Sequence, residues 1–291
     1  MEKINILIGC LSFKELTGSE LYVFELAKGL KKIGHNVSII SPIIGNPLID
    51  MANELYIPVY NINYPPNEKF DLIHCQHKSV TTNLISIYPD IKKICSIHSE
   101  VTVEEYPVIH ESIHKYIAIR PSIKDMLINT FNINEKIIES IYNPIDIDRF
   151  NLNDTKNLGY VLFVGSLEHL REKSLFDISE YCIENNKELW IVGKNHSNYL
   201  QLLLSQKHVK YFTETNEIEK FVKECDETAG ILLGRTTIEG WMCGKKGWIY
   251  NVDSSGNILS KQLHDIPEDI DKFKSDNVVK EIIQQYISII E

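Results

Sequence analysis

Two cationic side chains follow a short apolar run in the second half of the chain. Arg171 and Lys173 come after residues 160–165, which have the composition of a buried strand. Cations fixed at the end of a strand can stabilise the negative charge that develops on a departing phosphate, and one such contact is commonly worth about 3–4 kcal/mol. The alternative is that both are solvated charges at a helix start, because Glu168 and Glu172 lie beside them.

A second polar group follows the apolar run at residues 230–233. The residues that end this run and begin a short helix are Gly234, Arg235, Thr236 and Thr237. The free N–H groups of such a helix start can hold a diphosphate, and Arg235 adds positive charge. Glu239 on the same helix can accept two hydrogen bonds from a ribose diol. Its alternative role is a capping box with Thr236.

The first half offers one glycine and one histidine. Gly18 opens a helix, where a ligand can approach backbone N–H groups and the helix dipole favours an anion. The alternative is a flexible turn with Ser19 as the N-cap. His98 ends an apolar run, so we expect it to face a ligand site; the alternative is a core histidine bonded to a backbone carbonyl. The chain has neither a Gly-x-Gly-x-x-Gly turn nor a Gly-Lys-Ser/Thr loop.

Two further groups of residues attract attention but carry no predicted chemistry. His74 and His77 lie three positions apart at a strand end, so they point to opposite faces, and we predict no metal site there. Glu104 and Glu105 are adjacent, and adjacent helical residues diverge, so we interpret this pair as a solvated face.

Short β-rich runs alternate with amphipathic segments, which is the rhythm of a parallel α/β sheet. The first half contains a predicted helix over 18–34 and strands at 4–10, 37–41, 57–62, 72–75, 94–98, 116–119 and 138–142. After a polar linker at 151–159, strands are predicted at 160–165, 189–193, 209–212, 230–233 and 248–252. A last helix over 276–290 carries apolar residues at helical spacing: Val278, Val279, Ile282, Ile283, Tyr286 and Ile289.

The composition narrows the class of protein. The 291 residues are 43% apolar and 24% charged, enough chain for one large or two ordinary domains. A formal charge of −10 argues against nucleic acid as the main ligand. Six cysteines without a Cys-x-x-Cys pair favour a reducing, cytoplasmic location. The amino terminus predicts a strand and not a signal peptide, and no uncharged run reaches the roughly 18 residues of a membrane-spanning helix.

These segments resemble the family 4 retaining glycosyltransferases over most of residues 1–260. The motifs that carry the resemblance are Gly18-Ser-Glu-Leu21, Gly34-His-Asn-Val37, Phe70-Asp-Leu-Ile-His74, Ser96-Ile-His98, Tyr142-Asn-Pro-Ile-Asp146, Phe163-Val-Gly165-Ser-Leu167 and Gly234 to Gly244. By this resemblance Gly165 belongs to the family's Gly-Arg-Leu loop and binds the donor, His98 contacts the donor sugar near the reacting carbon, and Glu239 is the second of two family glutamates.

The chain departs from the family pattern at several positions. Ser166 replaces the usual arginine of the Gly-Arg-Leu loop, and the lysine lies two residues further on, so Arg171 can take over the guanidinium role. Ile231 stands where the first glutamate is expected, which leaves the donor sugar unspecified. Pro144 replaces a usual glycine.

The resemblance implies an α/β protein of GT-B type, with two Rossmann-like domains facing across a cleft. The expected parts are an acceptor domain over 1–150, a nucleotide-sugar domain over 151–275 and a packing helix over 276–291. The implied activity is metal-independent transfer of a hexose, with retention of configuration, from a nucleotide sugar, by preference a UDP-sugar, to a saccharide or other small acceptor.

Two other functions stay open for the same motifs. One is a non-catalytic nucleotide-sugar-binding protein, and the other is a GT-B type epimerase. The sequence predicts no cofactor and no metal, and it disfavours nucleic acid as a partner. It leaves the oligomeric state and a peripheral membrane contact unspecified.

Overall fold

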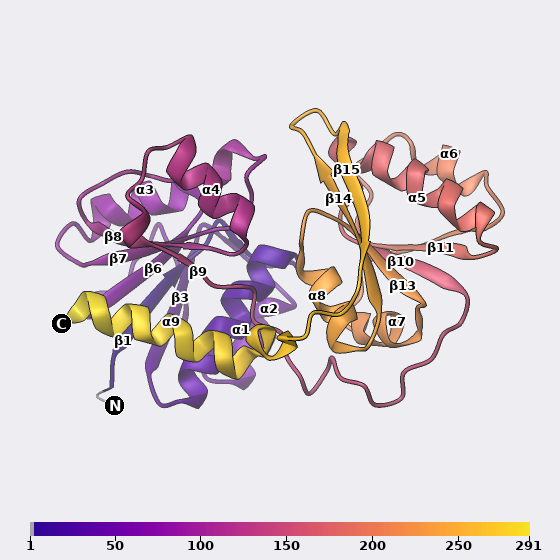
Figure 1. Cartoon of the computed structure of the whole chain (residues 1–291). Helices are drawn as coiled ribbons and strands as arrows, with labels where there is room; N and C mark the ends of the chain where they lie inside the picture. The colour runs from indigo at the N-terminus through magenta and orange to yellow at the C-terminus, as the bar shows by residue number, and fades with distance from the viewer. Residues whose placement is uncertain (1–2) are drawn as a thin grey trace. The chain divides into compact units, whose positions relative to one another are not determined.

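The computed structural model describes residues 3–291, which divide into two compact units (Figure 1). Unit 1 holds the described residues up to Pro144 together with Lys272–Glu291, and unit 2 is Ile145–Asp271. Residues 145–150 therefore group with the second unit and residues 272–291 with the first, whereas the sequence boundaries were expected after residues 150 and 275.

Unit 1 is built on a seven-stranded sheet in the order β5-β3-β1-β6-β7-β8-β9. All of its strand pairs are parallel. Parallel strands need cover on both faces, which explains their near-continuous apolar sequences. The strands are β1 (Asn5–Gly9), β3 (Asn36–Ser41), β5 (Val59–Asn61), β6 (Leu72–Gln76), β7 (Lys93–Ile97), β8 (Ile113–Ala118) and β9 (Ile138–Ser140); the short pair β2 (Ser12–Phe13) and β4 (Ile43–Ile44) lies outside this sheet.

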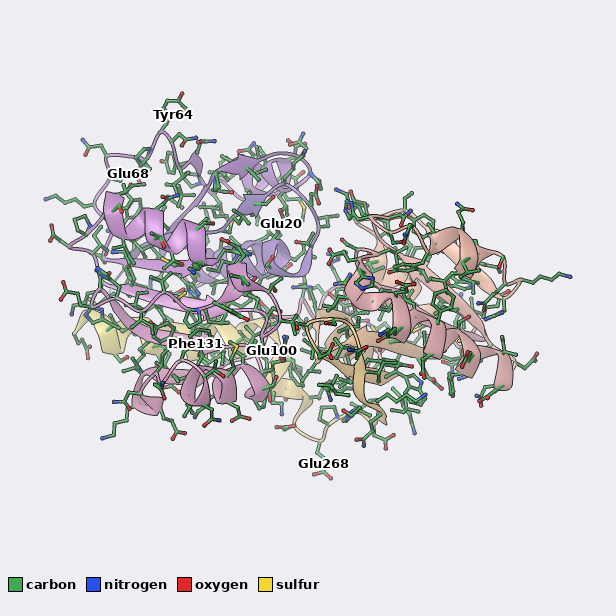
Figure 2. The ribbon with its side chains drawn as sticks, turned by 90° about the horizontal axis from the view of Figure 1, so that it is seen from above. Glu20, Tyr64, Glu68, Glu100, Phe131 and Glu268 are labelled. Carbon is green, nitrogen blue, oxygen red and sulfur yellow. The ribbon has the colours of Figure 1, made fainter. Side chains whose placement is uncertain are left out.

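Helices cover both faces of this sheet, with α1 and α9 on one side and α3 and α4 on the other (Figure 1). Their bounds are α1 (Gly18–Lys32), α2 (Leu48–Glu54), α3 (Lys78–Ile87), α4 (Pro121–Asn129) and α9 (Ser275–Ile290), with 3-10 turns η1 (Val103–Glu105) and η2 (Glu135–Ile137). Polar side chains such as Tyr64 project outward, whereas Glu20 lies within the unit (Figure 2).

Unit 2 contains a six-stranded sheet in the order β12-β11-β10-β13-β14-β15. The first five strands are parallel to one another. β15 is an edge strand and pairs antiparallel with β14. The strands are β10 (Tyr160–Val164), β11 (Glu188–Val192), β12 (Val209–Phe212), β13 (Glu227–Ile231), β14 (Lys246–Val252) and β15 (Ile258–His264). The helices are α5 (Glu172–Glu184), α6 (Leu200–Leu204), α7 (Ile218–Glu224) and α8 (Arg235–Met242), with 3-10 turns η3 (His169–Arg171) and η4 (Ile270–Phe273), the last of which spans the boundary between the units.

The predicted alternation of strands and helices is present, and several bounds differ from the predicted ones. β13 begins three residues before the predicted run because Glu227 pairs with Val161 of β10, so a polar residue starts a buried strand. β9 ends at Ser140, two residues before the predicted end. The sequence analysis did not predict β15, most of whose residues are exposed.

Helix α9 completes the core of unit 1 from the far end of the chain. All six apolar residues predicted to pack are buried, which confirms that interpretation. The helix lies against α1 and β8. At the crossing with α1, Gly29 leaves room for Val279, since a Cβ at Gly29 would stand 2.5 Å from Cγ2 of Val279. Among residues 3–291, no helix has the length and apolarity needed to span a membrane.

We expect Gly29→Leu to lower the free energy of unfolding of unit 1 by about 1–3 kcal/mol, because the added side chain would enter a close-packed helix crossing. Urea denaturation followed by far-UV circular dichroism measures this loss. The double variant with Val279→Ala should lose less than the sum of the two single changes. Gly18→Ala is the control, because a Cβ there meets no atom within 4 Å. Additive losses would show that the two residues do not meet.

Candidate functional site

The candidate residues of unit 1 lie where neighbouring parallel strands end. β1, β6 and β7 are adjacent in the sheet, so the segments that follow them begin at one edge. The main-chain N–H of Leu11, after β1, donates to Nδ1 of His77, after β6, at 3.2 Å. Nε2 of His77 then faces Oε1 of Glu105 at 3.3 Å. The loops after β1, β6 and β7 are thus connected through one imidazole.

His98 is half-buried directly after β7, as predicted. Its main-chain N–H donates to Oε2 of Glu105 at 3.1 Å, and its ring packs edge-on against Tyr22, with the ring centroids 4.6 Å apart. Burial lowers the pKa of His98 to about 4 even though Glu105 acts in the opposite direction. Nε2 of His98 is buried and has no hydrogen-bond partner among the described residues. The side chain is therefore neutral at pH 7 and can accept or donate one further hydrogen bond.

The interpretation of Glu104 and Glu105 as a solvated pair is wrong for Glu105. The two side chains diverge as expected, but this divergence sends Glu105 inward, where it is 8% exposed. Glu104 accepts hydrogen bonds from the main chain and hydroxyl of Ser79. Burial would raise the pKa of Glu105, but the hydrogen bond from His77 and the nearby imidazole of His98 bring it below its ordinary value. The buried carboxylate is thus held in its charged form.

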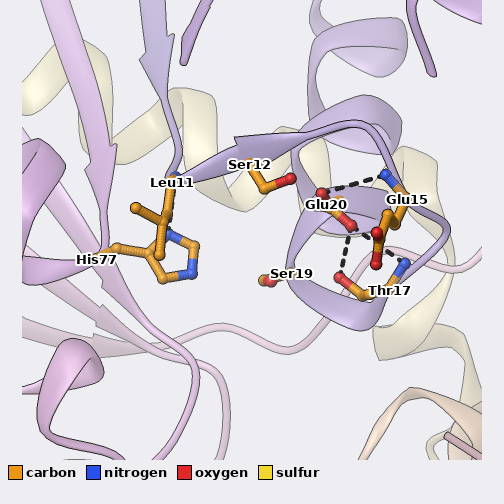
Figure 3. A pocket seen from close by; sticks show the side chains of 7 residues that line it. All are labelled: Leu11, Ser12, Glu15, Thr17, Ser19, Glu20 and His77. Atoms are coloured by element: carbon orange, nitrogen blue, oxygen red, sulfur yellow. Dashed lines mark hydrogen bonds between the residues drawn. The ribbon is translucent and has the colours of Figure 1, made fainter. Parts of the chain in front are cut away.

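A hollow of about 180 Å³ opens between the loop after β1 and the start of α1 (Figure 3). Its wall is formed by Leu11, Ser12, Glu15, Thr17, Ser19, Glu20 and His77. Thr17, and not Ser19, is the N-cap of α1, so the alternative role considered for Ser19 is wrong. Gly18 is the first helical residue and has open space around its Cα. Its predicted contact with a ligand remains a prediction.

An acidic side chain already occupies the approach to this helix start. The Glu20 carboxylate accepts the main-chain N–H groups of Lys14 and Glu15 at 3.2 Å each and the hydroxyl of Thr17 at 2.8 Å. Figure 3 shows the bonds of Glu20 to Glu15 and Thr17. The dipole that was expected to attract an anionic ligand at Gly18 therefore faces an internal carboxylate, which would repel a phosphate.

His74 and His77 have different surroundings, and their orientation to opposite faces remains a prediction. His74 is fully buried and bonds to the hydroxyls of Ser96 and Tyr286. His77 faces the hollow. Within residues 3–291, the structure contains no group of three or more His, Cys, Asp or Glu residues arranged to hold a metal ion.

In unit 2 two glycines allow the ends of β10 and β11 to approach each other closely. Gly165 and Gly193 have φ angles of +150° and +152°. A Cβ on Gly193 would stand 2.2 Å from the carbonyl oxygen of Gly165, so this contact excludes other residues. Gly165 donates its N–H to Val192 at 2.9 Å, which fixes the loop that follows β10.

The structure brings Arg171 to the glycine loop that the sequence analysis selected. Its guanidinium donates to the carbonyl of Ser166, and a Cβ on Gly165 would stand 2.5 Å from Nη1. The guanidinium also lies 5.8 Å from the ring centre of Phe163. Burial lowers the pKa of Arg171, yet a guanidinium stays charged in proteins. A fixed positive charge therefore stands beside the turn after β10.

Lys173 occupies a different environment. It is exposed, in agreement with the alternative of a solvated charge, and its Nζ donates to Oδ1 of Asn257 in the turn between β14 and β15. Asn257 in turn bonds to Asp253 through its main chain and its side chain. The structure thus ties Lys173 to this hairpin turn, and its predicted role in transfer remains a prediction.

The second predicted anion site is a helix start, as expected. Gly234 is the N-cap of α8, and the predicted residues Arg235, Thr236 and Thr237 are its first three positions. Thr237 is buried with its Oγ1 directed toward Gly230, so its side chain faces the sheet and only its N–H belongs to the helix start. Because β10 and β13 are neighbours, this helix start and the Gly165 loop begin at the same edge of the sheet.

Glu239 faces Arg235 from the next turn of α8. Nε of Arg235 donates to Oε1 of Glu239 at 2.6 Å, and the two side chains are only 8% and 5% exposed. The i, i+4 spacing places both residues on one helix face. The capping-box alternative is wrong because the N-cap is Gly234 and not Thr236. Contact of Glu239 with a ribose remains a prediction. The guanidinium of Arg235 faces this carboxylate, and its predicted contact with a diphosphate also remains a prediction.

Sequence reasoning missed the residues that support His98. Glu105 and Tyr22 lie in separate segments, and nothing in their local sequence indicates that they meet one histidine. His77 did carry a signal, since it follows a predicted strand just as His98 does. Ile231, which replaces the expected glutamate, ends β13 and packs against the core of unit 2.

Comparison with known protein families confirms the resemblance found in the sequence. Residues 16–149 match the model of Glycosyltransferase Family 4. Among curated protein sequences, none matches the chain.

The fold of the whole chain is shared with solved glycosyltransferases. One from Rickettsia africae ESF-5 aligns over 100% of both chains with a TM-score of 0.74 at 14% identity. AviGT4, a glycosyltransferase involved in avilamycin A biosynthesis, aligns over 99% of this chain and 98% of its own, with a TM-score of 0.71 at 11% identity. Anabaena Alr3699/HepE, solved with UDP-glucose, aligns over 99% and 92%, with a TM-score of 0.68 at 16% identity. The chain therefore has the predicted GT-B fold.

We expect Glu239→Ala to lower the free energy of unfolding of unit 2 by about 3 kcal/mol, because it removes the carboxylate that faces a buried guanidinium. All three tryptophans, Trp190, Trp241 and Trp248, lie in unit 2, so urea denaturation followed by tryptophan fluorescence reports on this unit. Glu217→Ala breaks an exposed ion pair with Lys220 and should cost much less, because water and salt screen the pair. Equal stability of the two variants would contradict the buried pair.

We expect the free energy of unfolding to fall in mild acid because the imidazoles of His74 and His98 are buried. Burial lowers the pKa of His74 to about 3 and that of His98 to about 4, from an ordinary value of 6.5. Between pH 6.5 and 4 the unfolded chain binds protons that the folded chain does not, so the free energy of unfolding falls as the pH falls, by up to about 1.4 kcal/mol per pH unit for each imidazole. Glu100 and Glu105, whose pKa values are also lowered, add to this loss at the acid end.

Urea denaturation at a series of pH values measures this dependence. His98→Gln should flatten the profile, whereas His169→Gln, which removes an 81% exposed side chain, should leave it unchanged. A wild-type profile that is flat from pH 6.5 to 4.5 would contradict the burial of these rings.

Proposed function

Because residues 16–149 match Glycosyltransferase Family 4 and the whole chain has the GT-B fold, we propose that this protein transfers a hexose from a UDP-sugar to a saccharide or other small acceptor with retention of configuration. UDP is the preferred nucleotide because Alr3699/HepE of the same fold was solved with UDP-glucose. Unit 2 binds the donor and unit 1 the acceptor. The six free, buried cysteines support a reducing, cytoplasmic location.

The observation that carries the proposal is that a guanidinium and the N-terminus of a helix lie at the same edge of the sheet in unit 2. The Arg171 guanidinium is fixed beside the loop after β10, and the start of α8 follows the neighbouring strand β13. A diphosphate at this edge would meet a fixed positive charge and free N–H groups together. Arg171 is half-buried and already hydrogen-bonded, so little reorganisation is needed when negative charge develops.

In the proposed reaction the bond from the anomeric carbon to the diphosphate breaks, and a bond from this carbon to the acceptor oxygen forms on the same face. The acceptor proton moves to an oxygen of the departing diphosphate. Arg171 and the α8 N–H groups stabilise the charge on the leaving group, so the proposal needs no metal ion. Neutral His98 contributes a hydrogen bond near the reacting carbon through its free Nε2.

Ile231 favours a second candidate, a non-catalytic nucleotide-sugar-binding protein. The apolar side chain at the end of β13 packs against the core, where the family resemblance places a glutamate that contacts sugar hydroxyls. Such a protein would bind the nucleotide sugar but would neither transfer nor hydrolyse it.

Thermal-shift measurements with UDP-, GDP-, ADP- and TDP-sugars test donor binding, since a ligand that binds the folded state raises the melting temperature. Turnover is then followed by NMR with a panel of saccharide acceptors, with and without EDTA. The proposal predicts a product with the donor's anomeric configuration and unchanged rates in EDTA. Donor binding without transfer or hydrolysis would establish the binding protein instead, and altered sugar without acceptor would establish an epimerase.

Arg171→Ala should lower kcat by about 100- to 1000-fold with a smaller loss of UDP affinity, because the guanidinium acts mainly on charge that develops in the transition state. Arg171→Lys should recover part of this loss. Arg149→Ala, which removes another partly buried arginine of unit 2 that is paired with Glu219, is the matched control. Equal losses in kcat and UDP affinity at residue 171 would contradict a role in the transition state.

A further inference from the structure

Four buried polar side chains form a continuous chain through unit 1. Tyr286 of α9 bonds to Nδ1 of His74 at 2.5 Å, and Nε2 of His74 bonds to Oγ of Ser96 at 2.6 Å. Ser96 in turn bonds to the hydroxyl of Tyr22 at 3.0 Å. The four residues come from α9, β6, β7 and α1, and none is more than 1% exposed.

The single hydrogen on the His74 ring couples two bonds of this chain. Burial lowers the pKa of His74 to about 3, so its ring carries one hydrogen at pH 7 and donates from one nitrogen while it accepts at the other. If Tyr286 donates to His74, then His74 donates to Ser96. If Ser96 donates to His74 instead, then His74 donates to Tyr286, and Tyr22 donates to Ser96. The chain is therefore a coupled unit rather than three separate contacts.

One end of this chain lies against His98. The ring of Tyr22 meets the ring of His98 edge-on, at an angle of 80° and a centroid distance of 4.6 Å. Tyr22 also packs edge-on against His74, with a centroid distance of 6.1 Å. Glu105 fixes the main chain of His98, and Tyr22 is the aromatic partner of its ring. The position of the His98 ring thus depends on the position of Tyr22, whose hydroxyl the chain anchors.

We propose that Tyr22, Ser96, His74 and Tyr286 form a positioning network for His98, with its far end anchored in the C-terminal helix. This inference rests on the proposed function, in which His98 acts on the sugar. The four residues are positioning residues, since none is placed in contact with substrate. Tyr286 contributes although three hydrogen bonds separate its hydroxyl from Tyr22.

Packing alone does not require this chain. Apolar side chains of the same shape can replace a pair of buried hydrogen-bonding groups at little cost, whereas loss of a single partner leaves a buried polar group unsatisfied. A purely structural role would therefore lower stability without changing the activity of the folded protein. A positioning role changes kcat in protein that remains folded.

The test compares Tyr22→Phe and Tyr286→Phe with Tyr116→Phe. Tyr116 is an equally buried tyrosine of unit 1 whose hydroxyl donates to the carbonyl of Val108 at 2.7 Å, outside the chain. We expect each of the first two variants to lower kcat by about 10-fold or more while the KM for the donor stays within about two-fold, because a small displacement of an active-site group strongly affects rate. Tyr116→Phe should leave kcat within about two-fold of wild type.

A second measurement does not depend on turnover. Nitrogen-15 NMR of the His98 imidazole at pH 7.5 should show shifted resonances in Tyr286→Phe and in Ser96→Ala, and the double variant should shift no further than either single one. A His98 signal that is unchanged in folded Tyr286→Phe protein would overturn the inference, as would an unchanged kcat in Tyr22→Phe. If wild-type protein shows no turnover, the proposed function fails, while the NMR comparison still decides whether the network positions His98.

Discussion

The carboxylate of Glu105 organises the edge of the first sheet. It accepts the main-chain N–H of His98 and faces Nε2 of His77, whose other nitrogen accepts the N–H of Leu11. Three loops that follow parallel strands are therefore joined through one buried negative charge. A sheet covered on both faces leaves few polar groups in contact with water, so a carboxylate buried at this edge needs internal partners. Glu100 meets the same requirement through Arg120.

Unit 2 builds its candidate site differently, from close backbone approach and a helix start. Gly165 and Gly193 bring two strand ends together, and Arg171 turns back over this loop. Beside them, Arg235 and Glu239 neutralise each other on one face of α8. Of these cations, Arg171 is the one that the structure fixes beside the glycine loop. The guanidinium of Arg171 lies beside the loop in which Ser166 replaces the usual arginine, whereas Lys173 is held by the turn between β14 and β15.

Much of the fold was predictable because apolar periodicity is a local property. The buried face of α9 and the strands of both sheets follow directly from it. β15 was missed because most of its residues are exposed and carry no such pattern. The candidate positions Gly165, His98 and Gly234 were accessible from sequence because each follows an apolar run. The side-chain contacts near these positions could not be predicted. The contacts of Glu105 with His77 and of Arg235 with Glu239 depend on the side-chain conformations in the folded protein. The spacing of the latter pair was visible, but its burial was not.

Unit 1 is assembled from two pieces of chain that are separated by the whole of unit 2. The groove at Gly29 and the imidazole of His74 receive Val279 and Tyr286 only after residues 145–271 have been synthesised. Unit 2 is continuous and can fold while it emerges from the ribosome. Because synthesis proceeds at roughly 5–20 residues per second, the first sheet remains without α9 for on the order of ten seconds. During this time the apolar groups that α9 later covers remain exposed in the nascent first half.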